Sequence, residues 1–296
     1  MAPLFGIWKS IATARRLTTL LPSHTFVLSY FRTFVLSYFR TFELDAQHPM
    51  DGKPEITFFG AHSSGRRTPS SAATLKLWNS TIMKLFVYDH CPFCVKARMI
   101  FGLKQIAVEL VILANDDEAT PIRMIGKKMA PILQDGDQYL AESMDIVAHI
   151  DGMSGARSLF GPSNSRLAKW NQDVTAPLYS LAIPRWATSD FEEFSAPAAR
   201  AYFTRNKERM LGSFEAHLAA SPDYIASLNR HLLELEPLIQ SPDAVNGELS
   251  EDDIHLFATL RSMSIVQGII YPPAVEAYRV RMSERSGINL HDPIAI

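Results

Sequence analysis

The sequence predicts two folded parts: an α/β domain with a small mixed sheet at residues 83–152, and an all-helical domain at residues 163–296. Two observations support this prediction. Between residues 83 and 151, short apolar runs alternate with stretches of helical spacing, whereas no convincing strand follows residue 162. A third observation concerns chemistry, because the only two cysteines of the chain, Cys91 and Cys94, lie where the first strand meets the first helix.

The first strand and the first helix flank these cysteines. Residues 84–88 (KLFVY) form a strand-like apolar run, and a helical pattern follows it. Cys91 falls where a helix N-cap should be. Pro92 then occupies the first helical position, where its missing N–H costs nothing. Gly102 is predicted to end this helix.

The remaining elements of the α/β domain follow in order. Residues 108–113 (VELVIL) are apolar almost throughout and are predicted to form a central strand. Residues 120–124 form a short helix, and residues 131–140 form a hairpin around an Asp-Gly-Asp turn. A third helix has Ser143 as its N-cap and runs to Asp151. The first two strands should be parallel.

A Gly- and Pro-containing linker at residues 153–162 separates the helical part. Prolines are expected to kink or separate its helices, which are predicted at residues 163–180, 198–212, 224–239, 254–266 and 274–285. Ser250 and Asp253 form a capping-box variant, so the apolar run that follows should be a central buried helix.

The first 82 residues do not form a recognisable domain. They contain the direct repeat TFVLSYFR, at residues 25–32 and 33–40, and are otherwise rich in Ser, Thr, Gly and Pro. We predict a disordered or non-native extension, with Met83 as the true start. A targeting segment around Arg15 and Arg16 is the alternative. In a genuine segment, the repeat would be prone to β-aggregation.

Composition excludes several classes of protein. Two cysteines are too few for a disulfide scaffold and suit a reducing, cytoplasmic compartment. Residues 83–296 carry 20 Lys and Arg against 27 Asp and Glu, which argues against a nucleic acid as partner. The sequence contains no membrane-spanning apolar run. The usual four-ligand Cys/His cluster is also missing, so no metal is expected.

The Cys-x-x-Cys pair is typical of thiol–disulfide exchange. At a helix N-terminus, Cys91 gains N–H donors and the positive end of the helix dipole, which favour the thiolate. Cys94 lies one turn along the same face, so it can resolve a mixed disulfide on Cys91. His90, Lys96 and Arg98 could add positive potential. The alternatives are that the cysteines only pack or form half a metal site, and that His90 is a solvent-facing loop residue, the interpretation we favour for it.

Two further elements could complete a site. Pro131 belongs at a strand start, since it cannot donate to a central ladder, and it could be cis beside an active site. The exposed backbone of Ala130 could then pair with a peptide-like ligand. Glu142 and Ser143 open a helix whose free N–H groups could hold a carboxylate. An ordinary trans edge proline and a plain N-cap are the respective alternatives.

Four stretches of residues 83–296 resemble the two-domain bacterial glutaredoxins of the glutathione S-transferase-like type, the glutaredoxin 2 family. They are YDHCPFCVKARMIFGLK at 88–104, NDDEATPIRMIGKKMAPILQ at 115–134, ESMDIV at 142–147 and SPDAVNGELSEDDIHLF at 241–257. The resemblance implies a thioredoxin-like N-terminal domain, an all-α glutathione S-transferase-like C-terminal domain, and glutathione as the electron donor.

The resemblance also assigns roles to single residues. Cys91 would carry the glutathione mixed disulfide, and Pro131 would be the family's cis-proline. Ala130 would pair with the cysteinyl part of glutathione, and Glu142 with Ser143 would hold its γ-glutamyl end. The family more often has tyrosine at Phe93 and valine at Ala130; the first difference could alter glutathione contacts, and the second only loosens packing.

The sequence therefore predicts a glutathione-dependent thiol–disulfide oxidoreductase, a glutaredoxin that works in electron transport through a redox-active Cys-Pro-Phe-Cys dithiol. Its partners would be glutathione and disulfide-containing proteins, with glutathione reductase as the indirect electron source, and it is expected to be a monomer. A glutathione transferase that conjugates electrophiles is one alternative. A non-enzymatic scaffold, such as one for an iron–sulfur cluster shared in a dimer, is another.

Overall fold

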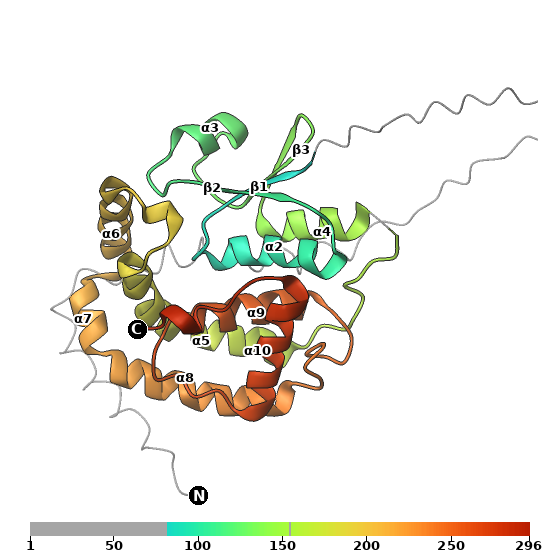
Figure 1. The fold of residues 1–296 in the computed structure, drawn as a ribbon. Coiled ribbons are helices and arrows are strands. Elements are labelled where there is room, and N and C mark those ends of the chain that lie inside the picture. Colours follow the sequence, from blue (N-terminus) through green and yellow to red (C-terminus); the bar gives the residue numbers. More distant parts are fainter. Residues whose placement is uncertain (1–81, 154) are drawn as a thin grey trace, which may run out of the picture. The chain divides into compact units, whose positions relative to one another are not determined.

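A computed structural model describes residues 82–153 and 155–296 of the chain (Figure 1). The predictions for the N-terminal extension and its repeat lie outside the described residues. The α/β half and the helical half belong to the same compact unit.

The sheet of the α/β half has four strands in the order β2-β1-β3-β4. They are β1 (Lys84–Val87), β2 (Glu109–Ile112), β3 (Ile132–Asp135) and β4 (Gln138–Ala141). β1 pairs in parallel with β2 and antiparallel with β3, and β3 forms the predicted hairpin with β4. The mixed sheet and the parallel first crossover are thus confirmed.

The predicted central position of the second strand is wrong, because β2 lies at one edge of the sheet. Its Leu110 side chain is 43% exposed. The apolar run reflects the packing of Val111, Ile112 and Leu113 against the core. Whether a strand is central depends instead on which strands pair with it, and β1 pairs with β3 on its other side.

Three helices accompany the sheet: α2 (Pro92–Lys104), α3 (Ala119–Ile125) and α4 (Ser143–Met153). α2 and α4 pack against each other on one side of the sheet, and α3 lies on the other (Figure 1). α3 extends one residue beyond the predicted helix at each end, and Gly126 caps it with φ of 76°. α4 begins at Ser143 itself, so the N-cap prediction is off by one position and Glu142 precedes the helix with φ of 69°.

Gly102 does not end α2, contrary to the prediction. The helix continues to Lys104, and Gln105 takes the left-handed cap conformation with φ of 54°. Gly102 lies instead against the C-terminal end of another helix. A Cβ atom added there would come within 2.7 Å of the Ser286 Cα and closer still to the Ser286 carbonyl. The glycine therefore permits close packing between helices.

The helical half contains α5 (Ser165–Thr188), α6 (Pro197–Leu211), α7 (Phe214–Ala219), α8 (Ser221–Leu235), α9 (Glu251–Met263) and α10 (Pro273–Ser286), together with the 3₁₀ turns η1 (Glu192–Phe194), η2 (Glu236–Leu238) and η3 (Asp292–Ile294). α5 runs on through Pro177 and Pro184, so these prolines do not separate helices. α7 was not predicted. α4 ends at Met153 and α5 begins at Ser165, and the domain division at residues 153–162 remains a prediction.

α9 is the predicted central helix. It begins with the capping box of Ser250 and Asp253, in which the Ser250 N–H donates to Asp253 Oδ2 over 2.9 Å. Most of its side chains are buried. α9 packs against α5 within the helical half and against α2 of the α/β half. The helix that begins at the cysteine pair is therefore supported directly by the helical half.

Candidate active site

Cys91 is the N-cap residue of α2, as predicted. Its backbone is extended, with φ of −76° and ψ of 120°, and its carbonyl accepts the first helical hydrogen bond from Val95 N–H over 3.0 Å. Its own N–H donates to the Tyr88 carbonyl over 3.3 Å. Cys91 is partly exposed, Cys94 is fully buried, and both are free thiols. A partner disulfide can thus reach only the first cysteine directly.

The two thiols differ in acidity. A hydrogen bond from Cys94 is the largest effect that lowers the pKa of Cys91 to about 6; burial opposes it, and the charge of His90 and the N–H groups of Cys94 and Phe93 assist. Burial, together with the hydrogen bond to Cys91 and its charge, raises the pKa of Cys94 well above its usual value. The Tyr88 N–H donates to Cys94 Sγ over 3.3 Å. The pair thus has one thiolate and one thiol at neutral pH.

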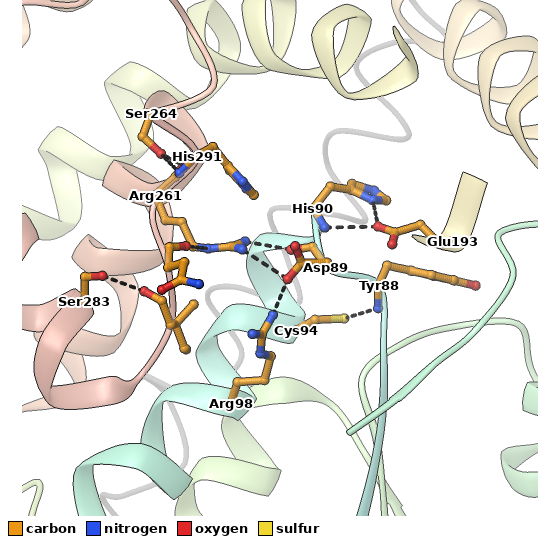
Figure 2. A network of polar contacts seen from close by, with 12 residues as sticks. Tyr88, Asp89, His90, Cys94, Arg98, Glu193, Arg261, Ser264, Ser283 and His291 are labelled. Atoms are coloured by element: carbon orange, nitrogen blue, oxygen red, sulfur yellow. Dashed lines mark hydrogen bonds and ion pairs between the residues drawn. The ribbon is translucent and has the colours of Figure 1, made fainter. Parts of the chain in front are cut away.

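His90 is not a solvent-facing loop residue, contrary to the interpretation we favoured. Only 6% of it is exposed, and it lies among aromatic rings of the helical half. Its backbone N–H donates to Glu193 Oε1 over 3.1 Å, and its Nδ1 lies 2.6 Å from the same oxygen (Figure 2). A carboxylate over one hundred positions away therefore holds the residue that precedes the nucleophilic cysteine.

Asp89 joins the segment before the cysteines to the helical half (Figure 2). Arg261 of α9 donates to the Asp89 carbonyl over 2.6 Å and to its Oδ1 over 3.1 Å, and Arg98 of α2 donates to the same oxygen. Burial opposes ionisation of Asp89, but the charges of Arg261 and Arg98 outweigh it and hold the pKa of this carboxyl below its usual range. Arg98 therefore pairs with Asp89, and its charge offsets only a small part of the rise in the pKa of Cys94.

Lys96 is buried within α2, with its Nζ 4.9 Å from the centre of the Phe93 ring. Burial lowers the pKa of Lys96 to about 7, while the charge of Cys91 favours its protonated form. Lys96 therefore adds positive potential near Cys91 only in its protonated form, which burial disfavours and the Cys91 thiolate favours.

The sheet register brings the other two predicted elements to the end where the cysteines lie. Phe86 of β1 pairs with Ile132, and Ile132 pairs with Ala141. Pro131 precedes Ile132 and Glu142 follows Ala141, so both lie at the end of the sheet where β1 leads into Cys91. The Ala130–Pro131 peptide bond is cis. Ser143 is buried at the start of α4, so the three elements share one end of the sheet.

The helical half contributes residues to the site that the sequence pattern does not identify. Glu193 lies in η1, Arg261 in α9 and Lys207 in α6, where burial lowers the pKa of Lys207 and the charge of Cys91 opposes this. A charged residue in a helical pattern is ordinarily solvent-exposed, so nothing local distinguished these three. Burial of Arg261, at 3% exposure, and of Glu193, at 1%, appears only in the folded chain.

The described residues contain no cluster of three or more His, Cys, Asp or Glu side chains able to hold a metal ion. In the same part of the chain, no helix combines the length and the apolar character that crossing a membrane requires.

The fold and the two family models that match place the chain in a class. Residues 85–158 match the family described as glutathione S-transferase, N-terminal domain, and residues 166–295 match glutaredoxin 2, C terminal domain. The class is that of proteins with a thioredoxin-fold N-terminal domain and a helical, glutathione S-transferase-like C-terminal domain. A glutathione S-transferase of Ceriporiopsis subvermispora shares this fold, with a TM-score of 0.55 at 15% identity over 70% of this chain and 98% of that one.

Within this class, the chain belongs to the glutaredoxin 2 family. It is 49% identical over 215 residues to glutaredoxin 2 of Escherichia coli strain K12, which covers 72% of this chain and 100% of the relative. The structure of glutaredoxin 2 from Salmonella typhimurium in complex with glutathione is also similar. It has a TM-score of 0.72 and 55% sequence identity, over 72% of this chain and 99% of that chain.

Proposed function

We propose that the protein is a glutathione-dependent thiol–disulfide oxidoreductase that reduces protein disulfides and glutathione mixed disulfides through Cys91 and Cys94. The main support is the asymmetry of the pair. Cys91 is partly exposed with a pKa of about 6, while Cys94 is buried with a raised pKa. A thiolate nucleophile beside a protonated resolving thiol is the arrangement that disulfide exchange requires.

The reaction on a glutathione mixed disulfide has two exchange steps. The Cys91 thiolate attacks the glutathione sulfur, forming an enzyme–glutathione disulfide and releasing the substrate thiolate, which takes a proton from solvent. A second glutathione, as its thiolate, attacks the glutathione sulfur of that intermediate. It forms oxidised glutathione and returns Cys91 as thiolate. Glutathione reductase would then reduce the oxidised glutathione with electrons from NADPH.

A protein disulfide requires Cys94 as well. Attack by Cys91 forms a mixed disulfide with the protein and releases one protein thiolate. This step removes the negative charge of Cys91, which is one of the causes of the raised pKa of Cys94. Cys94 then ionises more readily, attacks Cys91 and releases the second protein thiolate. Two glutathione molecules reduce the resulting Cys91–Cys94 disulfide.

Glutathione would lie along the end of the sheet that carries the predicted residues. Its sulfur would face Cys91 beside Phe93, its cysteinyl backbone would pair with Ala130 next to Pro131, and its γ-glutamyl group would lie at Glu142 and Ser143. The relative from Salmonella typhimurium has glutathione bound, which supports this ligand. A monomer in a reducing, cytoplasmic compartment remains part of the proposal.

The test is reduction of a glutathione mixed disulfide, coupled to NADPH through glutathione reductase. Cys91→Ser should lose activity, whereas Cys94→Ser should keep activity on glutathione mixed disulfides and lose it on protein disulfides. Full activity of Cys91→Ser would overturn the mechanism. Conjugation of an electrophile to glutathione, with no reductase activity, would support the transferase alternative instead.

A further inference from the structure

Glu193 is the most deeply buried carboxylate near the dithiol, and the reaction described above does not use it. It belongs to η1 of the helical half, and only 1% of the residue is exposed. Its Oε1 accepts from the His90 backbone and contacts the His90 ring, while its Oε2 is buried with no hydrogen-bond partner among the described residues. A buried charge that is only half satisfied is costly to stability.

We propose that Glu193 is a positioning residue for the Cys91 nucleophile, acting through His90. This inference rests on the proposed function, in which Cys91 is the attacking thiolate. Through one oxygen, Glu193 fixes both the backbone and the ring of the residue bonded directly to Cys91. The helical half would thus determine how readily the first cysteine reacts.

The geometry leaves His90 little freedom. Its ring centre lies 5.1 Å from that of Trp186, 5.2 Å from that of Phe194 and 5.2 Å from that of Phe203. Glu193 is itself anchored to the α/β half, because its carbonyl accepts from the Asn115 N–H over 2.9 Å. Aromatic packing therefore holds His90 in place, and a backbone hydrogen bond holds Glu193 in place.

The electrostatics give a direction to the effect. Burial alone would raise the pKa of Glu193, but the hydrogen bonds and charge of His90 outweigh it and lower this pKa. The Glu193 carboxylate holds the His90 backbone and the imidazole Nδ1 through one oxygen, directly before Cys91. Positive charge at His90 in turn favours the Cys91 thiolate. Loss of the Glu193 charge should therefore make Cys91 less acidic.

Other charged groups lie around the His90–Glu193 pair, and the variants of the test leave them unsubstituted. They are Asp89 and Arg98 beside the cysteines, Arg200 and Lys207 of α6, Arg261 of α9, and His291 near the C-terminus.

The test follows alkylation of Cys91 by iodoacetamide against pH, in the full chain carrying Cys94→Ser. Glu193→Gln keeps the size of the side chain and removes its charge. It should move the midpoint upward by about half a pH unit, so that the thiolate fraction well below the midpoint falls about threefold. Glu192→Gln is the matched control, since Glu192 is the exposed neighbour in the same turn, and it should leave the midpoint unchanged.

Three further variants separate positioning from a general effect on folding. His90→Asn should also raise the midpoint, and adding Glu193→Gln to it should change nothing more, because Glu193 acts only through His90. Glu193→Asp, which keeps the charge, should recover most of the shift. An unchanged midpoint in Glu193→Gln, or independent additive shifts in the double variant, would overturn the proposal. Since alkylation needs no glutathione, this result stands apart from the reductase assay.

Discussion

Gly102 provides a sharp test of how the two halves pack. The substitution Gly102→Ala adds one methyl group on α2, where Cα, C and O of Ser286 would all lie within 2.7 Å of it. Carbon atoms in contact are ordinarily about 3.5–4.0 Å apart, so α2 and the end of α10 must separate by about 1 Å or more. The clash is with backbone, which cannot rotate away as a side chain can.

Two opposing terms set the magnitude. Alanine in a helix interior gains about 1 kcal/mol over glycine, whereas overpacking of a core costs about 1–3 kcal/mol, and a backbone clash belongs at the upper end or beyond. We expect a net loss of about 2 kcal/mol. With a urea dependence of about 2 kcal/mol per M, the unfolding midpoint should fall by about 1 M.

Gly152 supplies the matched control. It also lies within a helix, α4, but it is exposed, and an added Cβ atom meets nothing within 4 Å. Gly152→Ala should therefore stabilise the protein by about 0.4–1 kcal/mol. Equilibrium urea unfolding followed by circular dichroism measures both variants. A Gly102→Ala midpoint equal to or above that of the unsubstituted protein would refute the packing argument.

Three other predictions concern the cap, the link between the halves and the nucleophile. Ser250→Ala removes the capping box with Asp253 and should cost about 0.5–2 kcal/mol, and unchanged urea unfolding would count against the cap. Arg261→Leu removes the hydrogen bonds to the Asn289 and Asp89 carbonyls and one of the two donors to the Asp89 carboxylate, and should cost about 3 kcal/mol, whereas Arg281→Leu, at an exposed ion pair, should cost less than about 1 kcal/mol; equal losses in thermal or urea unfolding would contradict this. Because the pKa of Cys91 is lower in the folded chain than in the unfolded one, its ionisation should stabilise the fold fully above about pH 9, and this contribution should be lost as the pH falls through about 6; alkylation of native Cys91 with a midpoint near 8.5 would refute it.

Local patterns predicted the local features of the site correctly. Pro92 after Cys91 placed the first cysteine at a helix N-cap, and the structure has it there. The Asp-Gly-Asp turn predicted the hairpin, and Ser250 predicted the start of α9. Each of these features depends on residues within about four positions of one another. Their hydrogen bonds form wherever that short segment folds.

Features that depend on distant parts of the chain were missed or wrongly assigned. Gly102 resembles the glycine that often ends a helix. It is needed instead because the Ser286 backbone, 184 positions further along, leaves no room for a Cβ atom. His90 resembled a loop residue, yet Glu193 and four aromatic rings of the helical half surround it. The apolar residues of β2 are typical of a central strand, but β2 lies at one edge of the sheet. Apolar content does not identify which strands pair with one another.

The sequence by itself determined the chemistry of the pair: two thiols one helical turn apart, with the first at a helix N-terminus and the second placed to resolve a mixed disulfide on it. Backbone geometry and the helix dipole act within a single turn, so they follow from neighbouring residues. Tertiary structure alone decided which charges and rings surround Cys91. Electrostatic and packing forces act through space, and only the folded chain brings Glu193 and Arg261 to the residues that precede it.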